Sequence, residues 1–422
     1  MKLVITEKPS VAMALASVLG ARTRKDGCVE GNGYIVSWCV GHLVGLCDAS
    51  EYDEKYKKWR YEDLPIVPEC WKHKILEGTK KQFGILKKLM RDSKVDEVIC
   101  ATDAGREGEL IFRLVYEQAG CKKPMKRLWI SSMEEQAIKD GFASLKDGSC
   151  YDSLYQSALC RAKADWLVGI NASRLFSVLY NQNLKVGRVQ TPTLAMIVDR
   201  NQKIKEFTKE KYYMAHIKFD DMDAVTEHFQ KKEDADKVAA DCAERMCEVE
   251  KDDVKEKTVR PPKLYDLTTL QREANRMFGY TAQQTLDAVQ EMYEQKLVTY
   301  PRTDSQYLTD EMGENTETLI QMLLGKMPYA EGLEYQPDVS KVLNSKKVSD
   351  HHAIIPTMEV AKADIGELKE RNCKILYLIS ARVLTATADP YIYESHKCQI
   401  TCNYHTFYLN AKKTKQEGFK TI

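Results

Sequence analysis

The sequence predicts a multidomain protein that combines an α/β part with α+β parts, and three observations predict this class. The 422 residues suggest about two to four domains. Strand-like and helix-like runs alternate over residues 1–150, which favours an α/β domain with a mostly parallel sheet. Helical periodicity dominates residues 151–204, and β-type alternation returns at 391–410.

Composition narrows the class of protein. Hydrophobic residues make up 43% of the chain and charged residues 30%, as expected for a soluble globular protein. No apolar run approaches the roughly 18 residues that a membrane span needs, and the N-terminal MKLVITEKPS turns polar too early for a signal peptide. Thirteen scattered cysteines without a CxxC pair indicate reduced thiols in a cytoplasmic protein and no zinc site. The net charge of +1 does not by itself indicate a nucleic-acid partner.

The first elements follow from apolar runs and the residues that interrupt them. Residues 2–6 (KLVIT) predict a buried strand, and 7–20 (EKPSVAMALASVLG) predict a helix with proline early and glycine just past the end. Residues 95–102 (VDEVICAT) predict a second buried strand, 103–108 (DAGREG) a turn, and 109–120 (ELIFRLVYEQAG) an amphipathic helix.

The middle of the chain is assigned in the same way. Residues 127–130 (RLWI) predict a short strand. Long apolar periodicity predicts helices at 154–180 and 188–204. Residues 212–219 (YYMAHIKF) predict a strand, and 232–246 (KEDADKVAADCAERM) predict a polar helix.

Two capped helices and a third helix are expected further on. Thr268 with Gln271, and Thr281 with Gln284, each fit the spacing of a capping box at a helix N-terminus. Helical periodicity returns at residues 365–386.

Three carboxylates lie where predicted strands end. Glu7 closes the first strand, and Asp103 and Glu107 lie in the turn after the second. Ligands of open α/β sheets gather outside the carboxyl ends of the strands, and converging carboxylates suit a hard cation such as Mg²⁺. Glu107 alone is better explained by the helix dipole, whereas Glu7 and the DAGREG turn together favour a metal or acid/base site; Glu7 could instead donate or accept a proton.

The segment LVTYPRTDSQYL carries the most unusual tyrosine of the chain. Pro301 holds Tyr300 in extended backbone, so Tyr300 and Arg302 share a face. A guanidinium stabilises phenolate character and clamps phosphate, which is what a phosphotyrosine intermediate needs. The alternative is a core tyrosine beside a solvated arginine. His351, in SDHHAIIPT, is interpreted as a phosphate contact, with a metal pair or no role as alternatives.

Together these motifs resemble the type IA DNA topoisomerases, most closely the bacterial topoisomerase III group. The motifs are VITEKPS, VGHL, ATDAGREGELI, VGRVQTPTL, VTYPRTDS and DHHAIIPT, in the order typical of the family. The resemblance implies a Toprim α/β domain, a helical gate, a β-rich arch and a helical domain with the catalytic tyrosine. Their expected ranges are 1–150 for the Toprim domain, 151–210 for the first part of the gate or DNA-binding domain, 211–260 with 391–422 for the arch, and 261–390 for the tyrosine domain.

The resemblance also implies roles for individual residues. Tyr300 is expected to attack one DNA strand and become linked to a 5′ phosphate, with Arg302 on the scissile phosphate. The other catalytic residues implied are Glu7, Lys8 and His351, with Glu7 as a general acid or base. The implied Mg²⁺ ligands are Glu7, Asp103 and Glu107. The implied DNA-binding residues are His42, Arg161, Arg174, Lys185, Val186, Gly187, Arg188, Val189, Gln190, Gln290 and Glu294.

The expected activity is ATP-independent, because the phosphotyrosyl ester keeps the energy of the broken bond and the sequence has no GxxxxGK[ST] loop. The enzyme is expected to relax negatively supercoiled DNA or to decatenate, with Mg²⁺ but no zinc. DNA, single-stranded or negatively supercoiled, is the expected partner, without a membrane. A monomer associated with a bacterial nucleoid is expected, and the sequence identifies no protein partner.

Two departures from the family pattern leave alternatives open. Gly105 stands where many relatives have a second aspartate, which weakens a two-metal interpretation. The chain also stops where relatives continue, which suggests a truncated gene or a fragment without the later half of the gate. One alternative is therefore a remnant that binds or cleaves single-stranded DNA without strand passage. Another is a Toprim nuclease or primase, which would not need YPRTDS with Gln290 and Glu294 upstream.

Overall fold

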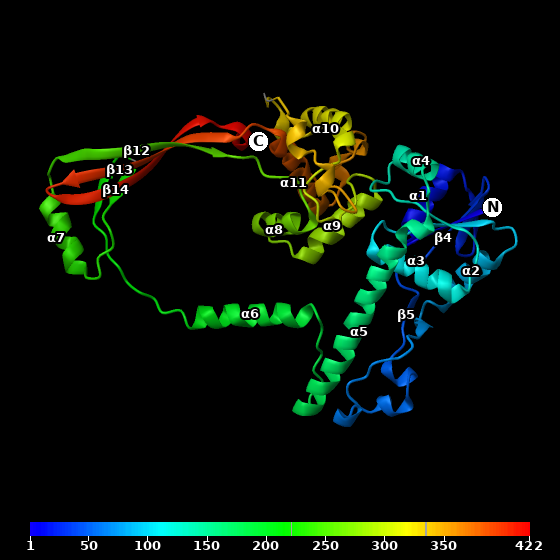
Figure 1. The fold of residues 1–422 in the computed structure, drawn as a ribbon. Helices are drawn as coiled ribbons and strands as arrows, with labels where there is room; N and C mark the ends of the chain where they lie inside the picture. Colours follow the sequence, from blue (N-terminus) through cyan, green and yellow to red (C-terminus); the bar gives the residue numbers. More distant parts are fainter. Residues whose placement is uncertain (221, 334–335) are drawn as a thin grey trace. The chain divides into compact units, whose positions relative to one another are not determined.

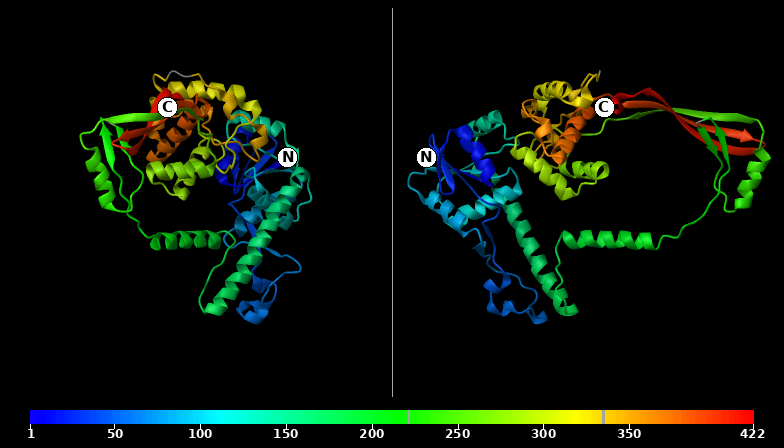
Figure 2. Two further views of the ribbon diagram at one scale, coloured as in Figure 1. Left: turned by 60° about the vertical axis from the view of Figure 1, so that its left-hand side comes forward. Right: turned by 180° about the vertical axis from the view of Figure 1, so that it is seen from behind.

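The computed structural model describes residues 1–220, 222–333 and 336–422. The chain forms two compact units, each built from separate stretches of sequence (Figures 1 and 2). Unit 1 comprises Met1–Gln202, Ala282–Asp304 and Ser349–His352, and unit 2 comprises Lys203–Thr281, Ser305–Val348 and Ala353–Ile422. Every residue expected to carry chemistry or bind DNA therefore belongs to unit 1.

Unit 1 contains a seven-stranded sheet of order β2-β3-β4-β1-β7-β8-β9. Its strands are β1 (Lys2–Thr6), β2 (Thr23–Lys25), β3 (Cys28–Gly31), β4 (Tyr34–Trp38), β7 (Glu97–Ala101), β8 (Met125–Arg127) and β9 (Lys146–Asp147). The four central strands are parallel, whereas both edges pair antiparallel. The sheet is thus mixed rather than mostly parallel. Its centre is fully buried, as the apolar runs of β1 and β7 require.

Helices cover the sheet of unit 1. Helices α1 (Pro9–Leu19) and α4 (Glu135–Ala143) contact each other, and α1 packs on β1, β3 and β4. Helices α2 (Lys80–Arg91), α3 (Arg106–Ala119) and α5 (Asp152–Tyr180) form a second group, in which α3 contacts both neighbours. The predicted ends of α1 and α3 are confirmed, because Gly20 and Gly120 adopt the left-handed conformation that closes a helix.

Three further elements complete unit 1. A two-stranded sheet joins β5 (Val44–Leu46) to β6 (His73–Ile75). Helix α9 (Ala282–Glu294) precedes the tyrosine segment. Helix α6 (Gln190–Lys205) begins in unit 1, and all of its side chains are exposed, including those of Leu194 and Met196.

Unit 2 joins a long antiparallel sheet to a group of helices. The sheet has the order β10-β11-β14-β13-β12. Its strands are β10 (His216–Phe219), β11 (Met222–Val225), β12 (Cys247–Val259), β13 (Tyr391–Cys402) and β14 (His405–Gln416). Thus strands from 211–260 pair with strands from 391–422. The helices are α7 (Lys232–Cys242), α8 (Leu267–Phe278), α10 (Gly313–Lys326) and α11 (Glu370–Thr387).

Several expected elements are shifted. The strand expected at 127–130 lies at Met125–Arg127, and the strand expected at 212–219 is confined to His216–Phe219. Helix α8 is capped by Asp266 rather than Thr268, because the Asp266 carboxylate accepts a 2.6 Å hydrogen bond from the Thr269 amide.

The helix expected at 365–386 begins at Glu370 after a short 3₁₀ turn. Within the described ranges, no helix is long and apolar enough to cross a membrane.

Candidate active site

The candidate active site begins where β1 and β7 end. These strands run parallel in register, with Thr6 opposite Ala101. Their carboxyl ends therefore lie side by side, and they bring Glu7 and Lys8 next to the turn that contains Asp103. This edge of the sheet is where the sequence predicted a cluster of carboxylates.

The turn after β7 is held by contacts that the sequence did not predict. The buried guanidinium of Arg127 donates hydrogen bonds of 2.7 Å to the carbonyls of both Thr102 and Asp103. The Thr102 hydroxyl donates to the Gly108 carbonyl at 2.8 Å. A Cβ atom at Gly108 would lie 2.1 Å from the Asp103 carbonyl oxygen, so only glycine permits this approach. Helix α3 and Arg127 thereby fix the backbone of Asp103.

Tyr300 enters this site from the segment after α9. Its hydroxyl donates a 3.1 Å hydrogen bond to Asp103 Oδ2, and its amide donates to the Ser131 carbonyl at 3.0 Å. The side chain is buried, with the residue 7% exposed. Arg302 Nη1 lies 4.0 Å from the same Asp103 oxygen. Tyr300 and Arg302 therefore approach one carboxylate, as residues two apart in extended backbone can.

The electrostatics of the site are dominated by closely spaced carboxylates. Burial, and then the charge of Asp103, raise the pKa of Glu7 to about 7, against the lowering effects of Lys8 and Arg302. Burial, and then Asp103, also raise the pKa of the Tyr300 phenol, while Arg302 lowers it. In this arrangement Tyr300 is protonated at neutral pH. A base or a new positive charge must act before the phenol becomes a nucleophile.

Helix α9 contributes a chain of polar side chains beside the tyrosine. Arg302 Nη1 donates to Gln290 Oε1 at 2.9 Å, and Gln290 Nε2 donates to Glu294 Oε1 at 3.0 Å. Glu294 also forms a 3.3 Å ion pair with Lys8. Four residues predicted from distant parts of the sequence therefore form one continuous network. Gln290 and Glu294 lie one helical turn apart, so both point along one face of α9.

His351 is packed inside the protein. Its Nε2 is hydrogen-bonded to the Ala104 carbonyl, and its Nδ1 lies 2.9 Å from Ser131 Oγ. A carbonyl only accepts, so Nε2 carries the proton and Nδ1 accepts from the serine. The ring lies 4.3 Å from the Tyr300 ring and stacks at 6.2 Å on Trp129. Both nitrogens have protein partners in this structure, and the phosphate contact that the sequence predicted stays a prediction.

Burial determines the charge of this histidine. It lowers the pKa of His351 to about 4, although the hydrogen bond to the Ala104 carbonyl acts in the opposite direction. His351 is therefore neutral at physiological pH. Ser131 and Trp129 belong to the site, but no local pattern in the sequence marked them.

An open pocket of about 400 Å³ collects most of these groups. The described residues that line it are Glu7, Asp103, Ala104, Gly105, Arg106, Glu107, Gly108, Arg161, Tyr300, Arg302, Asp350 and His351. His42 Nε2 lies 2.5 Å from Glu107 Oε1, and this hydrogen bond is the largest effect that lowers the pKa of Glu107. Arg161 thus lines the same pocket as the tyrosine, and His42 contacts Glu107 at its wall.

The three predicted metal ligands line this pocket without forming a compact cluster. Within the described ranges, no three His, Cys, Asp or Glu side chains are arranged to hold a metal ion. Glu7, Asp103 and Glu107 still offer only oxygen donors, which hard cations prefer. Burial and then the charge of Asp103 raise the pKa of Glu7, and a cation bound between the two carboxylates would relieve their repulsion. The donor set and its electrostatics fit a Mg²⁺ ion.

The remaining predicted DNA-binding residues lie elsewhere in unit 1. Arg174 and Lys185 line a second pocket, of about 570 Å³, together with Trp59. Arg174 is 7% exposed; its Nη1 donates to the Tyr56 carbonyl at 2.8 Å, and its guanidinium lies 5.4 Å from the Trp59 ring centroid. Within the part of the chain that is described, its Nε has no hydrogen-bond partner.

The segment 185–190 leads from this second pocket to α6. The Val186 amide is held by Ser173, and the Gly187 amide donates to Thr191. Arg188 pairs with Asp165 at 2.6 Å. Val189 is exposed, and Gln190 begins α6.

Comparisons with known proteins agree with the fold. Residues 2–133 match the Toprim domain, and residues 149–422 match the family described as DNA topoisomerase. A protein of Staphylococcus haemolyticus (strain JCSC1435) named DNA topoisomerase 3 is 40% identical over 429 residues, which cover 100% of this chain and 60% of the relative. A protein of the same name from Bacillus anthracis is 42% identical over 440 residues, which cover 99% of this chain and 59% of the relative.

A solved structure has the same fold. Full-length topoisomerase I from Thermotoga maritima superposes with a TM-score of 0.73 at 24% identity, over 100% of this chain and 67% of that one. The chain spans about 60% of the length of the curated relatives it matches. These comparisons confirm the mixed fold class expected from the sequence.

Proposed function

Because the chain belongs to the type IA DNA topoisomerases, we propose that it breaks and rejoins one DNA strand with Tyr300 as the nucleophile. One observation carries the proposal. The Tyr300 hydroxyl lies 3.1 Å from Asp103 in a pocket that Glu7 and Arg302 also line. A nucleophile, a proton acceptor and a phosphate clamp thus share one pocket, as covalent catalysis requires.

The chemical step exchanges one phosphodiester bond for another. The Tyr300 oxygen forms a bond to phosphorus while the bond from phosphorus to the 3′ oxygen breaks, which leaves the enzyme on the 5′ phosphate. The phenolic proton passes to the carboxylate that already accepts its hydrogen bond, Asp103. Glu7, with a pKa of about 7, exists in both forms near neutral pH and can donate a proton to the leaving 3′ oxygen. Religation reverses these transfers, so no ATP is consumed.

Arg302 is poised to bind the phosphate. Its guanidinium donates to the neutral amide of Gln290 and lies near the charged Asp103, and 45% of its side chain is exposed. A phosphate is a stronger acceptor than an amide, so a bound strand can replace Gln290 as the partner. The guanidinium then also favours the phenolate form of Tyr300, because it already lowers the pKa of that phenol.

The metal and the strand fit the same scheme. Asp103 and Glu107 would hold Mg²⁺, which would supply positive charge beside the scissile phosphate when bound, and Glu7 would be a third ligand only as the alternative to its role as proton donor. Arg174 and Lys185 would guide single-stranded DNA along the second pocket, where Trp59 offers an aromatic surface to a base. Relaxation of negatively supercoiled DNA and decatenation, which need strand passage, are part of the proposal.

A cleavage assay tests the chemical step. A labelled single-stranded oligonucleotide is mixed with the protein, with and without Mg²⁺, and the reaction is quenched with denaturant. We expect a protein-linked fragment attached through its 5′ end for the wild type and none for Tyr300→Phe. Normal DNA binding without any adduct from the wild type would contradict the proposal for this chain.

Plasmid relaxation then tests strand passage separately. If the protein forms the adduct but does not relax the plasmid, it cleaves single strands without passing another strand through the break. That result would contradict only the proposal of strand passage.

A further inference from the structure

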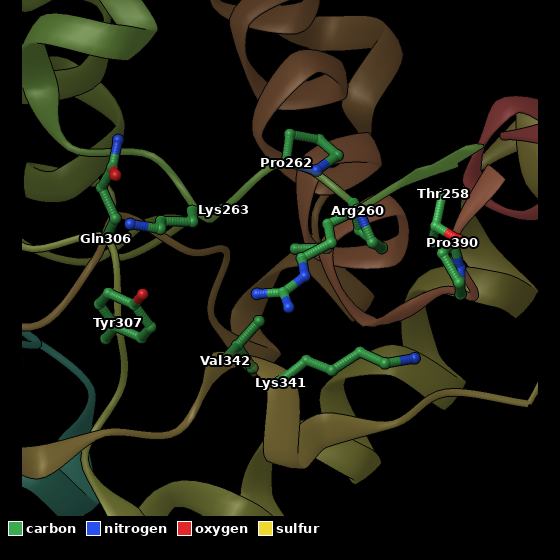
Figure 3. Close-up of a pocket in the computed structure, with 11 residues that line it drawn as sticks. Thr258, Arg260, Pro262, Lys263, Gln306, Tyr307, Lys341, Val342 and Pro390 are labelled. Atoms are coloured by element: carbon green, nitrogen blue, oxygen red, sulfur yellow. The ribbon is translucent and has the colours of Figure 1, made fainter. Parts of the chain in front are cut away.

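A third pocket lies in unit 2, where the sheet joins the helices, and it is basic (Figure 3). Residues 260–266 connect β12 to α8, and residues 388–390 connect α11 to β13. Both connections supply lining residues, as do the segments around Tyr307 and Val342. The pocket encloses about 480 Å³, within the range of sites that bind small molecules.

The charged residues that are described in the lining of this pocket are all basic. Of the eleven described residues that line it, none is acidic, and Arg260, Lys263 and Lys341 are basic. Lys341 pairs with Asp389 at 3.4 Å and is largely neutralised. Arg260 differs, because it makes no hydrogen bond or ion pair within the described residues and is exposed. In Figure 3 its side chain extends into the middle of the pocket, with Lys263, Gln306 and Tyr307 on one side.

The surroundings and the pKa of Tyr307 indicate how positively charged this part of the pocket is. The Lys263 and Lys347 ammonium groups lie 5.2 and 4.8 Å from its ring centroid, and Lys347 Nζ lies 3.4 Å from its hydroxyl. Burial raises the pKa of the phenol, but the two lysines outweigh it and bring the pKa below its ordinary value. Two cations beside a phenol, with no carboxylate among the described lining residues, favour the binding of an anion.

Part of the pocket wall is apolar, and a simple anion would not need it. The apolar lining residues are Pro261, Pro262, Val342, Ala386 and Pro390. Flat proline rings and short aliphatic side chains suit a sugar or a base, which must be desolvated when it binds. The pocket therefore pairs an anion site with an apolar surface of nucleotide size.

We propose that this pocket binds a nucleotide unit, with its phosphate at Arg260 and Lys263 and its sugar and base against the proline wall. The unit belongs either to a DNA strand or to a free nucleotide, since both present the same chemistry. A bound unit would touch both connections between the sheet and the helices. Its occupancy would therefore tie these two parts of unit 2 together.

Lysine labelling tests the site directly. The full chain carries Tyr300→Phe, so that cleavage does not interfere, and an amine-reactive ester is used with mass spectrometry. We expect thymidine 5′-monophosphate or a thymidine 12-mer to slow labelling of Lys263, while exposed Lys237 on α7 is unaffected. Arg260→Gln should weaken this protection about tenfold, since it removes a charge-assisted contact. Arg245→Gln, which changes another exposed arginine of unit 2, is the control and should leave it unchanged.

The probes separate the sources of the ligand. Protection by the 12-mer alone identifies a DNA strand, and protection by the mononucleotide alone identifies a free nucleotide. Equal protection by inorganic phosphate would overturn the role of the apolar wall. Absence of protection by every probe, or equal protection in Arg260→Gln, would overturn the site. None of these results depends on covalent chemistry at Tyr300, so failure here is distinct from failure of the cleavage proposal.

Discussion

Tyr300 and Tyr307 lie close in sequence, but opposite charges surround them. The Tyr300 hydroxyl donates to Asp103, and burial together with that carboxylate raises its pKa. Tyr307 lies between Lys263 and Lys347, which lower its pKa in spite of burial. The acidic side chains around Tyr300 belong to unit 1, and the basic ones around Tyr307 belong to unit 2.

If Tyr300 is the nucleophile, as proposed, then the nucleophilic tyrosine is not the one with the lower pKa of the two. Tyr307 has the more stable phenolate, yet a phenolate held by two lysines is stabilised and correspondingly less reactive. Under the proposed function, Tyr300 would keep its proton until a carboxylate accepts it, and its positive partner Arg302 would be shared with the substrate phosphate. The reactivity of Tyr300 would then depend on the substrate, which would protect the resting protein from side reactions.

The largest expected effect separates the two tyrosines. Tyr300→Phe should abolish the covalent adduct with a single-stranded oligonucleotide, because the attacking oxygen is removed, while DNA binding stays near normal. Tyr307→Phe should form adduct at close to the wild-type rate. Denaturing gels of the quenched reaction measure the adduct, and fluorescence anisotropy measures binding. An adduct in Tyr300→Phe, or its loss only in Tyr307→Phe, would reverse the assignment.

The next effect concerns the acid beside Tyr300. Glu7→Gln should slow cleavage and religation about 10²–10⁴-fold, the usual contribution of a general acid or base, and should spare binding. Rapid-quench kinetics on a labelled oligonucleotide give both rates. Glu97→Gln, at the start of β7, is a matched control outside the pocket and should leave them unchanged. A collapse of binding in Glu7→Gln would mean that Glu7 is structural.

Much of the fold near the site was predictable, because local signals and tertiary packing agree there. The apolar runs of β1 and β7 are buried at the sheet centre, and glycines end α1 and α3 where the sequence suggested. Strand β12 was missed, since its sequence CEVEKDDVKEKTV is charged and almost wholly exposed. Its register with β13 stabilises it, and pairing with a partner about 140 residues away leaves no local pattern.

The residues of the site also fall into two groups, those that the sequence predicted and those that it did not. Asp103, Tyr300 and Arg302 stood out because their neighbours in sequence suggested a strand end or an extended chain. Arg127 and Trp129 did not, since an arginine and a tryptophan in a short apolar run look like ordinary strand residues. Their importance comes from contacts with distant backbone: Arg127 binds the carbonyls after β7, and Trp129 donates to the Asp350 carbonyl at 3.3 Å.

A smaller effect is expected from His351, which lies beside Tyr300 but is neutral. Its folded pKa of about 4 is below the unfolded value of about 6.5. Its stabilising contribution is therefore present above pH 6.5 and is lost as the pH falls through 4. The shift corresponds to at most about 3 kcal/mol of unfolding free energy.

This contribution can be measured in unit 1 alone. All five tryptophans (Trp38, Trp59, Trp71, Trp129 and Trp166) belong to unit 1, so their fluorescence during urea unfolding reports on that unit. The stability difference between wild type and His351→Gln should shrink between pH 7 and pH 4. His216→Gln, an exposed histidine of unit 2, should leave the signal unchanged. A pH-independent difference for His351→Gln would show that this histidine does not titrate with folding.

The smallest expected effect concerns Tyr307, the second tyrosine of the comparison. Lys347→Ala should raise the pKa of Tyr307, because it removes one of the two ammonium groups that lower it. NMR of ring-labelled tyrosine, with the Tyr307 signal assigned through Tyr307→Phe, follows the titration. Lys346→Ala changes the adjacent exposed lysine and should have no effect. An unchanged pKa in Lys347→Ala would mean that the positive field comes from elsewhere, and would weaken the contrast with Tyr300.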